Sequence, residues 1–225
     1  MNKDFIRINI SNIYRSVLQV KWKTIILVYF LCSQVLFGQD RQAELDQYRM
    51  RYTVDNLQQG DRSPYSADDT LYLDFYDLDT SFIFQCQFKP ADTEDSFEME
   101  LYSGKTRTYI KKGYIEFEVD GESRQLALYQ DRRFIVHPVY KNNLFLPFKD
   151  LTNGVTTYGG GRYLELNKLQ IEDQKIEVNF NFAYNPWCVY SDGFNCPIPP
   201  IENHLDIAIH AGEKNYKKSY DESKH

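Results

Sequence analysis

The chain has 225 residues, of which 26 are basic and 32 acidic. The first 39 hold five of the basic residues and one acidic residue, so the remaining 186 carry a net charge of −10. This acidity argues against binding to nucleic acid or to an anionic membrane, because both need concentrated Lys and Arg, and the length suits one domain with a sizeable core.

The N-terminus has the order of a secretory signal peptide. Basic residues precede an apolar run of 14 residues, Thr24 to Phe37, and Gly38-Gln39 leads into acidic sequence. The run is shorter than the 18 or more residues of a membrane-spanning helix. We therefore expect residues 1–39 to be a signal peptide, and the mature protein to be exported to the periplasm or the extracellular space without membrane attachment. A retained N-terminal anchor is the alternative.

One mature helix is predicted, Glu44 to Tyr52, from apolar residues at helical spacing. Residues 53–70 are polar and predict a surface loop. From Leu71 the pattern alternates with period two in short runs separated by turn residues. These runs are LYLDFY (71–76), SFIFQCQF (81–88), FEMELY (97–102), TRTYIK (106–111), YIEFEV (114–119), RQLALYQ (124–130) and RFIVHPV (133–139), followed by residues 143–148, 162–166, 175–182 and 205–209.

Many short strands with close turns predict a mainly β fold, an antiparallel β-sandwich or barrel of about ten short strands. Asp120-Gly121 marks a hairpin between two of them. Residues 40–213 are expected to form a single domain, and the polar residues 214–225 a flexible tail.

Asn181 to Glu213 is the most unusual segment, a long irregular loop rich in Pro, Asn and aromatic residues and containing two cysteines. Loops of this length usually bind something or cover a site. Cys188 and Cys196 lie eight residues apart and are the candidate disulfide, while Cys86 reads as a small core residue. A Cys-Cys-His metal site with His204, or a nucleophilic Cys188 with His204 as its base, are alternatives. No metal or cofactor is expected.

Three blocks of sequence resemble a known family. They are Leu144 to Thr152 (LFLPFKDLT), Thr157 to Leu164 (TYGGGRYL), and Asn179 to Cys188 with its continuation through Cys196-Pro197-Ile198-Pro199-Pro200 to Ala211-Gly212-Glu213-Lys214. Together they resemble the DUF1684 family over essentially the whole mature chain. The resemblance implies a domain of roughly 200 residues and no assigned function. Asn179 departs from it, since the family pattern has aspartate at that position.

The glycines before Arg162 permit two interpretations. Three consecutive glycines could form a concave set of N–H donors beside the Arg162 guanidinium, which would bind an anion. Alternatively, they form a tight turn or bulge, and Arg162 pairs with an internal acid such as Glu213. The asparagines of the long loop could likewise line a pocket or satisfy the loop's own backbone.

Our first hypothesis is an exported β-rich domain that binds a small polar or anionic ligand between the Gly159–Arg162 turn and the long loop. Its site residues would be Arg162, Tyr163, Asn181, Tyr184, Asn185, Tyr190 and Glu213. A second hypothesis is a hydrolase that uses Glu213 or a Cys188–His204 pair. A third is a non-catalytic envelope protein that binds another protein, with its partner unknown.

Overall fold

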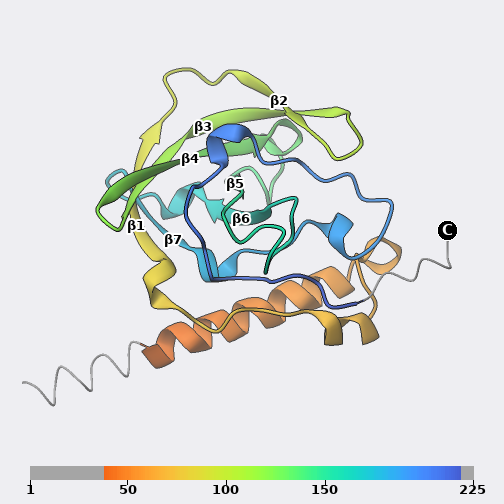
Figure 1. Ribbon diagram of the computed structural model, residues 1–225. Helices are drawn as coiled ribbons and strands as arrows, with labels where there is room; N and C mark the ends of the chain where they lie inside the picture. Colours follow the sequence, from red (N-terminus) through yellow and green to blue (C-terminus); the bar gives the residue numbers. More distant parts are fainter. Residues whose placement is uncertain (1–37, 219–225) are drawn as a thin grey trace, which may run out of the picture. The chain divides into compact units, whose positions relative to one another are not determined.

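The computed structural model describes residues 38–218 (Figure 1). The predicted signal peptide therefore lies almost wholly outside the described residues, as does the end of the predicted tail. Within residues 38–218, no helix is both long and apolar enough to cross a membrane. The chain divides into two units between Glu44 and Leu45, and the sheet and the long loop lie in the second unit.

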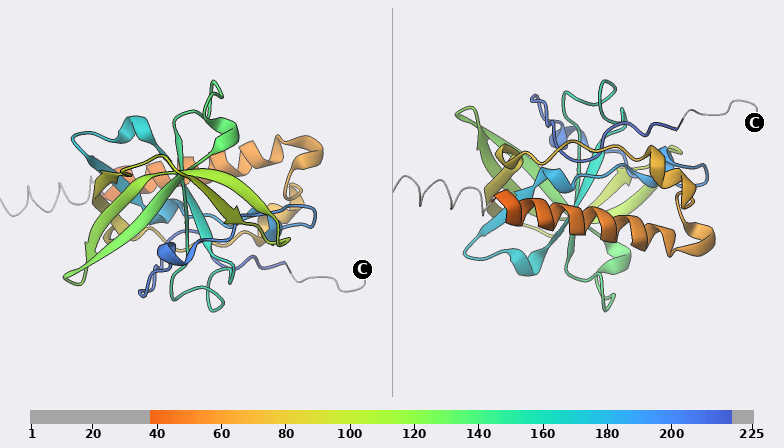
Figure 2. Two further views of the ribbon diagram at one scale, coloured as in Figure 1. Left: turned by 90° about the horizontal axis from the view of Figure 1, so that it is seen from above. Right: turned by 90° about the horizontal axis from the view of Figure 1, so that it is seen from below.

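Seven strands form one antiparallel sheet in the described part of the chain. Their bounds are β1 Ile83–Pro90, β2 Ser96–Glu100, β3 Thr106–Val119, β4 Glu122–Asp131, β5 Asn143–Phe148, β6 Arg162–Asn167 and β7 Lys175–Asn179. The sheet runs in the order β6-β5-β4-β3-β1-β7, and β2 pairs with β3 outside this path. β3 and β4 are long and bend strongly, so that the sheet curls into a half-barrel (Figure 2).

The mainly β prediction is confirmed, but residues 38–218 hold seven strands where about ten were expected. A two-sheet sandwich and a closed barrel are not confirmed. Residues 71–76 and 133–139 alternate in sequence without joining the sheet: the first starts in a 3-10 helix, Asp68–Tyr72, and the second in another, Arg132–Phe134. Val136 and Val139 are largely exposed. Alternation gives a strand its stability only when a neighbouring strand covers the apolar face.

The N-terminal helix runs from residue 38 to 57 and is longer than predicted. Leu45 and Asn56 are buried, and the Asn56 amide donates to the Tyr65 hydroxyl at 3.1 Å. The expected loop over residues 53–70 thus contains the end of the helix and buried side chains. At the other end of the chain, the Lys214 and Lys217 N–H groups donate to the Asp74 and Tyr72 carbonyls at 2.8 and 3.0 Å.

The two faces of the sheet have different roles because side chains alternate along each strand. One face carries the main hydrophobic core, which includes Leu126, Leu128, Leu144, Leu146, Phe148, Leu164 and Leu166. The opposite face carries a second, aromatic cluster that includes Tyr109, Tyr129, Phe145 and Tyr163. Tyr129 lies opposite Phe145, and Phe145 lies opposite Glu165, so these three form one row across β4, β5 and β6.

A bulge in β3 places residues of that strand on the correct faces. The register with β4 shifts between Lys111 and Gly113, at the point where the sequence had predicted a turn. The extra residue reverses the alternation, so that Tyr109 joins the aromatic face while Ile115 joins the main core. Gly113 has φ +151°, and a Cβ there would lie 2.3 Å from the Lys89 carbonyl oxygen, so only glycine fits.

Candidate functional site

Arg162 is fully buried and all its contacts are internal. Its Nη2 donates to Asp150 Oδ2 at 2.8 Å and to the Ile209 carbonyl at 3.0 Å. Its Nη1 donates to the Ala211 carbonyl and, at 3.3 Å, to that of Glu213. Arg162 thus fastens the segment 209–213 to β6. The expected internal acid exists, but it is Asp150, and the guanidinium faces no open space.

The glycines before Arg162 form a tight turn. Gly161 has φ +99°, and a Cβ on it would lie 2.7 Å from the Phe148 carbonyl oxygen and 2.7 Å from Pro199 Cγ. The close approach of β5 and the Pro199 ring to this backbone explains why a residue without a side chain is needed here.

Glu213 is also fully buried. Its carboxylate accepts from the Asn185 N–H at 2.9 Å and from the Tyr190 hydroxyl at 2.6 and 2.7 Å. Burial raises the pKa of Glu213 to about 7, against the opposing effect of these hydrogen bonds. The side chain holds the long loop in place, and no described contact brings it to a pocket.

The loop asparagines satisfy the backbone around them. Asn181 and the Asp79 backbone exchange hydrogen bonds of 3.0 and 2.8 Å, and the Asn185 amide donates to the Lys214 carbonyl at 2.8 Å. Asn179 Oδ1 accepts from the Asn181 N–H at 3.0 Å and from the Asn181 amide at 2.9 Å. A neutral Asn179 therefore performs this local role without a negative charge.

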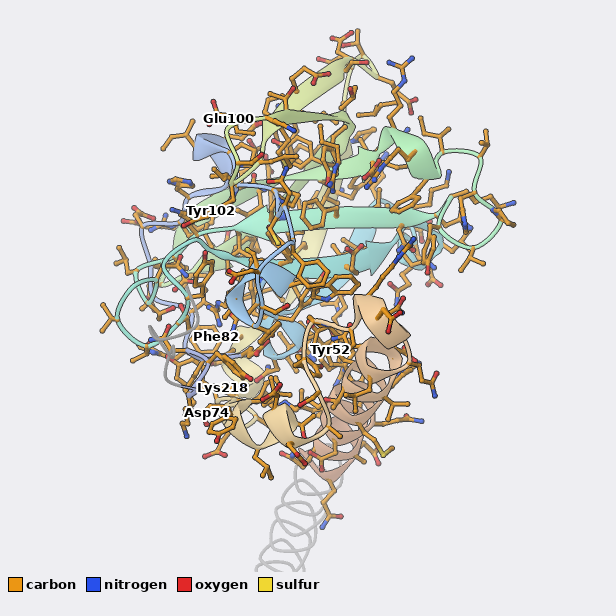
Figure 3. The ribbon with its side chains drawn as sticks, turned by 90° about the vertical axis from the view of Figure 1, so that its right-hand side faces the viewer. Tyr52, Asp74, Phe82, Glu100, Tyr102 and Lys218 are labelled. Carbon is orange, nitrogen blue, oxygen red and sulfur yellow. The ribbon has the colours of Figure 1, made fainter. Side chains whose placement is uncertain are left out.

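Two of the predicted ligand-binding residues, Tyr163 and Tyr184, line a pocket of about 1110 Å³. Its walls come from the helix, the aromatic face of the sheet, the segment after β4 and residues 187–197. From the helix come Tyr48, Arg51, Tyr52, Asp55 and Asn56; from the sheet and its flank Arg107, Tyr109, Gln130, Asp131, Arg133, Phe134, Tyr140, Asn143, Phe145, Tyr163 and Glu165; and from the long loop Tyr184, Trp187 and Gly193 to Pro197. Tyr52 projects from the helix toward the sheet (Figure 3).

Glu165 is the acidic side chain that distinguishes this pocket. It lies on β6 between the buried Leu164 and Leu166 and is open to solvent. The Tyr184 hydroxyl donates to its Oε1 at 3.1 Å. Protein surrounds the carboxylate on its other sides, and this desolvation, with a smaller contribution from Asp131, raises the pKa of Glu165 to about 7.

Tyr184 owes its position to a short backbone bridge. The Tyr163 N–H donates to the Tyr184 carbonyl at 2.9 Å, and the Tyr184 N–H returns a bond of 3.0 Å to the Tyr163 carbonyl. The start of the long loop thus pairs with β6, which is an edge strand of the sheet. This pairing places the Tyr184 ring beside Glu165, two residues further along β6.

Aromatic rings form a continuous wall around Glu165. The ring centroids of Tyr52 and Tyr184 are 5.1 Å apart, those of Tyr163 and Tyr184 are 5.8 Å apart, and those of Phe145 and Tyr163 are 4.8 Å apart. Aromatic pairs at such distances stabilise one another beyond the area they bury. The wall is therefore preformed, which lowers the entropy cost of binding a ligand.

Two arginines of the pocket already have partners within the protein. Arg133 binds Asp131 through two nitrogens, with Nη2 2.6 Å from Oδ2. Arg107 donates to the Asn195 carbonyl at 3.5 Å. These contacts hold the pocket walls together.

Cys188 and Cys196 lie side by side as free thiols. The Cys188 N–H donates to Cys196 Sγ at 3.2 Å, and the hydrogen bond between the thiols raises the pKa of Cys188 and lowers that of Cys196. Their proximity supports the choice of this pair, and the disulfide between them stays a prediction. Cys86 is buried in the main core, where burial raises its pKa to about 12.

The alternatives that use His204 gain no contact in the described part of the chain. His204 Nε2 lies 3.1 Å from the Pro199 carbonyl oxygen, and no hydrogen bond joins it to Cys188 within residues 38–218. The same residues hold no group of three or more His, Cys, Asp or Glu side chains placed to bind a metal ion.

A comparison with known protein families shows which family the chain belongs to. The family model described as protein of unknown function, DUF1684, matches residues 71–214. The chain belongs to the DUF1684 family. No curated protein matches it.

Solved structures similar to this DUF1684 chain include the solution NMR structure of an uncharacterized protein from gene locus rrnAC0354 of Haloarcula marismortui. The two are 30% identical, with a TM-score of 0.59, over 79% of this chain and 95% of the other. The similarity supports the fold. Both names leave the function open.

The sequence contained a signal for Glu165 that the first hypothesis did not use. In Arg162 to Asn167, RYLELN, the leucines occupy one face of the strand and Tyr163 and Glu165 the other. A carboxylate in the middle of a strand whose other face is core must face solvent or a cavity. The partner side chains come from five separate segments, and no local pattern joins them.

Proposed function

We propose that this DUF1684 domain binds a small organic molecule in the pocket that contains Glu165. The observation that carries the proposal is the combination of a preformed aromatic wall with a solvent-accessible carboxylate on a rigid strand. Pockets that bind small molecules are concave and mainly apolar, with a few polar groups that fix the orientation of the ligand. A ligand here would lie against Tyr163 and Tyr184 and direct a polar group to Glu165.

The proposal keeps the ligand-binding hypothesis but changes its site. Tyr163 and Tyr184 remain, whereas Arg162, Asn185 and Glu213 hold the fold together from within. A hydrolase that uses Glu213 would need a substrate to reach a fully buried carboxylate. For this reason we favour binding at Glu165 over hydrolysis at Glu213.

A pocket-filling variant tests this proposal without knowledge of the ligand. Asn143 lines the pocket from β5, and its side chain makes none of the hydrogen bonds described above. Asn143→Trp should fill part of the volume, and an aromatic residue suits a strand. Ser123→Trp, at an exposed position near the start of β4, is the matched control.

The measurement is ligand-detected NMR with a mixed set of cationic, neutral and anionic aromatic fragments, after the melting temperature of each variant has been checked. We expect several fragments to bind the wild type and Ser123→Trp, and Asn143→Trp to lose them. If no fragment binds, or if binding is the same in a folded Asn143→Trp, the pocket is not a ligand site.

We also propose that the protein is exported, on the basis of the basic-then-apolar order of residues 1–37. The intact mass of the protein, expressed with its full sequence in a bacterial host and recovered from the periplasm, tests this. The expected result is the mass of a protein that begins near Asp40. A full-length product that stays in the cytoplasm would contradict it.

A further inference from the structure

The charge near Glu165 indicates what kind of ligand the pocket takes. Within residues 38–218, no Lys or Arg forms an ion pair with Glu165, and its hydrogen-bond partner is the neutral Tyr184 hydroxyl. The nearby charge that acts on it is that of Asp131, which is also negative. A carboxylate without a positively charged partner can form a charge-assisted hydrogen bond with a cation that enters the pocket.

Two of the three arginines of the pocket are engaged elsewhere, and the third, Arg51, acts on Tyr48. Arg133 is held by Asp131, and Arg107 by the Asn195 backbone. Arg51, on the helix, is exposed and lies one helical turn before the exposed Asp55. Arg107 is on β3, and two strands, β5 and β4, lie between it and Glu165 on β6. The Glu165 end of the pocket therefore presents a negative charge with which no arginine of residues 38–218 forms an ion pair.

Aromatic faces surround this negative end. Tyr52 and Tyr48 have ring centroids 6.2 Å apart, and the Tyr52 ring continues to Tyr184, which contacts Glu165. Phe145 lies directly opposite Glu165 on β5. A carboxylate among aromatic rings attracts an organic cation twice, by its charge and by the negative faces of the rings.

We propose that the ligand of this pocket carries an ammonium group, which pairs with Glu165 and lies against the rings of Tyr48, Tyr52 and Tyr184. The inference rests on the proposed function, since it names the class of molecule bound at the same site. The organic body of the ligand extends along Phe145 and Tyr163 toward the neutral amides of Asn143 and Gln130.

Three small probes of similar size and different charge test the proposal. They are 2-phenylethylamine, 2-phenylethanol and 3-phenylpropionate, each titrated by NMR against the wild type at pH 8. We expect the amine to bind about tenfold more tightly than the alcohol, and the carboxylate to bind most weakly.

Glu165→Gln keeps the shape of the side chain and an acceptor for the Tyr184 hydroxyl while removing the charge. It should cost the amine about tenfold in affinity and leave the alcohol unchanged. Glu172→Gln, at an exposed position beyond β6, is the matched control.

Amine binding to the wild type should weaken as the pH falls from 8 to 5.5, because Glu165 becomes protonated, and Glu165→Gln should lack this dependence. Asp131, Arg133, Tyr48 and Arg51 are the other titratable groups that face this end of the pocket.

Failure of this inference is distinct from failure of the proposed function. If the alcohol or the carboxylate binds as tightly as the amine, or if mixed fragments bind in the pocket and the amine does not, the ammonium proposal is wrong and a ligand site remains. If nothing binds in a manner sensitive to Asn143→Trp, both are wrong.

Discussion

At the scale of single residues, Arg162 shows how a chemically suggestive residue can serve the fold. A guanidinium after three glycines fits an anion site equally well in sequence, and burial decides between the two uses. The side chain is 0% exposed, and its Nη1 and Nη2 atoms donate to Asp150 and to three carbonyls. Nothing local in the sequence indicates that residues 209–213 return to this point.

Loss of Arg162 should therefore damage stability and leave no specific binding defect. Arg162→Met removes one partner of a buried ion pair and leaves Asp150 uncompensated, which should lower the free energy of unfolding by about 3–5 kcal/mol. Urea denaturation measures this, with the exposed Arg132→Met as control. A change of less than about 1 kcal/mol in Arg162→Met would contradict a structural role.

At the scale of elements, the sequence predicts well what depends on local alternation. The bounds of β5 agree with the expectation from residues 143–148, and β4 differs by a few residues. The sequence predicted a turn at Lys112-Gly113, where the structure has the β3 bulge. Turns and bulges use the same residue types, so the dipeptide alone does not distinguish them. Gly113 is needed there to let β1 approach, a contact distant in sequence. The failures thus concern positions where pairing with a remote segment decides the structure.

The bridge between Tyr163 and Tyr184 is the element that completes the pocket. It joins the start of the long loop to the edge strand β6, and so places this irregular segment beside Glu165 as a wall of the pocket. The sequence predicted Tyr163 of β6 and Tyr184 of this loop among the candidate ligand-binding residues, and both line the pocket. Glu165 was not among them, although its place between Leu164 and Leu166 predicts that it faces solvent or a cavity. The tertiary pairing decides which of the two it faces.

At the scale of the whole molecule, the acidic side chains of this region have two uses. Asp150 and Glu213 lie inside and hold the long loop, whereas Glu165 opens into the pocket. The negative net charge of the mature chain, derived from the sequence, agrees with a preference for cationic ligands. The net charge does not show where such a ligand would bind. The position of the pocket follows only from the structure, in which the helix, four strands and the loop supply its walls.

A titration of Glu165 tests whether an organic cation binds at this carboxylate. Carboxyl carbon NMR of the wild type, with Glu165→Gln to assign the signal, gives its pKa with and without 2-phenylethylamine. We expect a pKa of about 7 for Glu165 in the free protein and a clear fall when the amine is present, because a bound cation favours the charged carboxylate. A pKa at the ordinary glutamate value of about 4.3, unchanged by the amine, would contradict it.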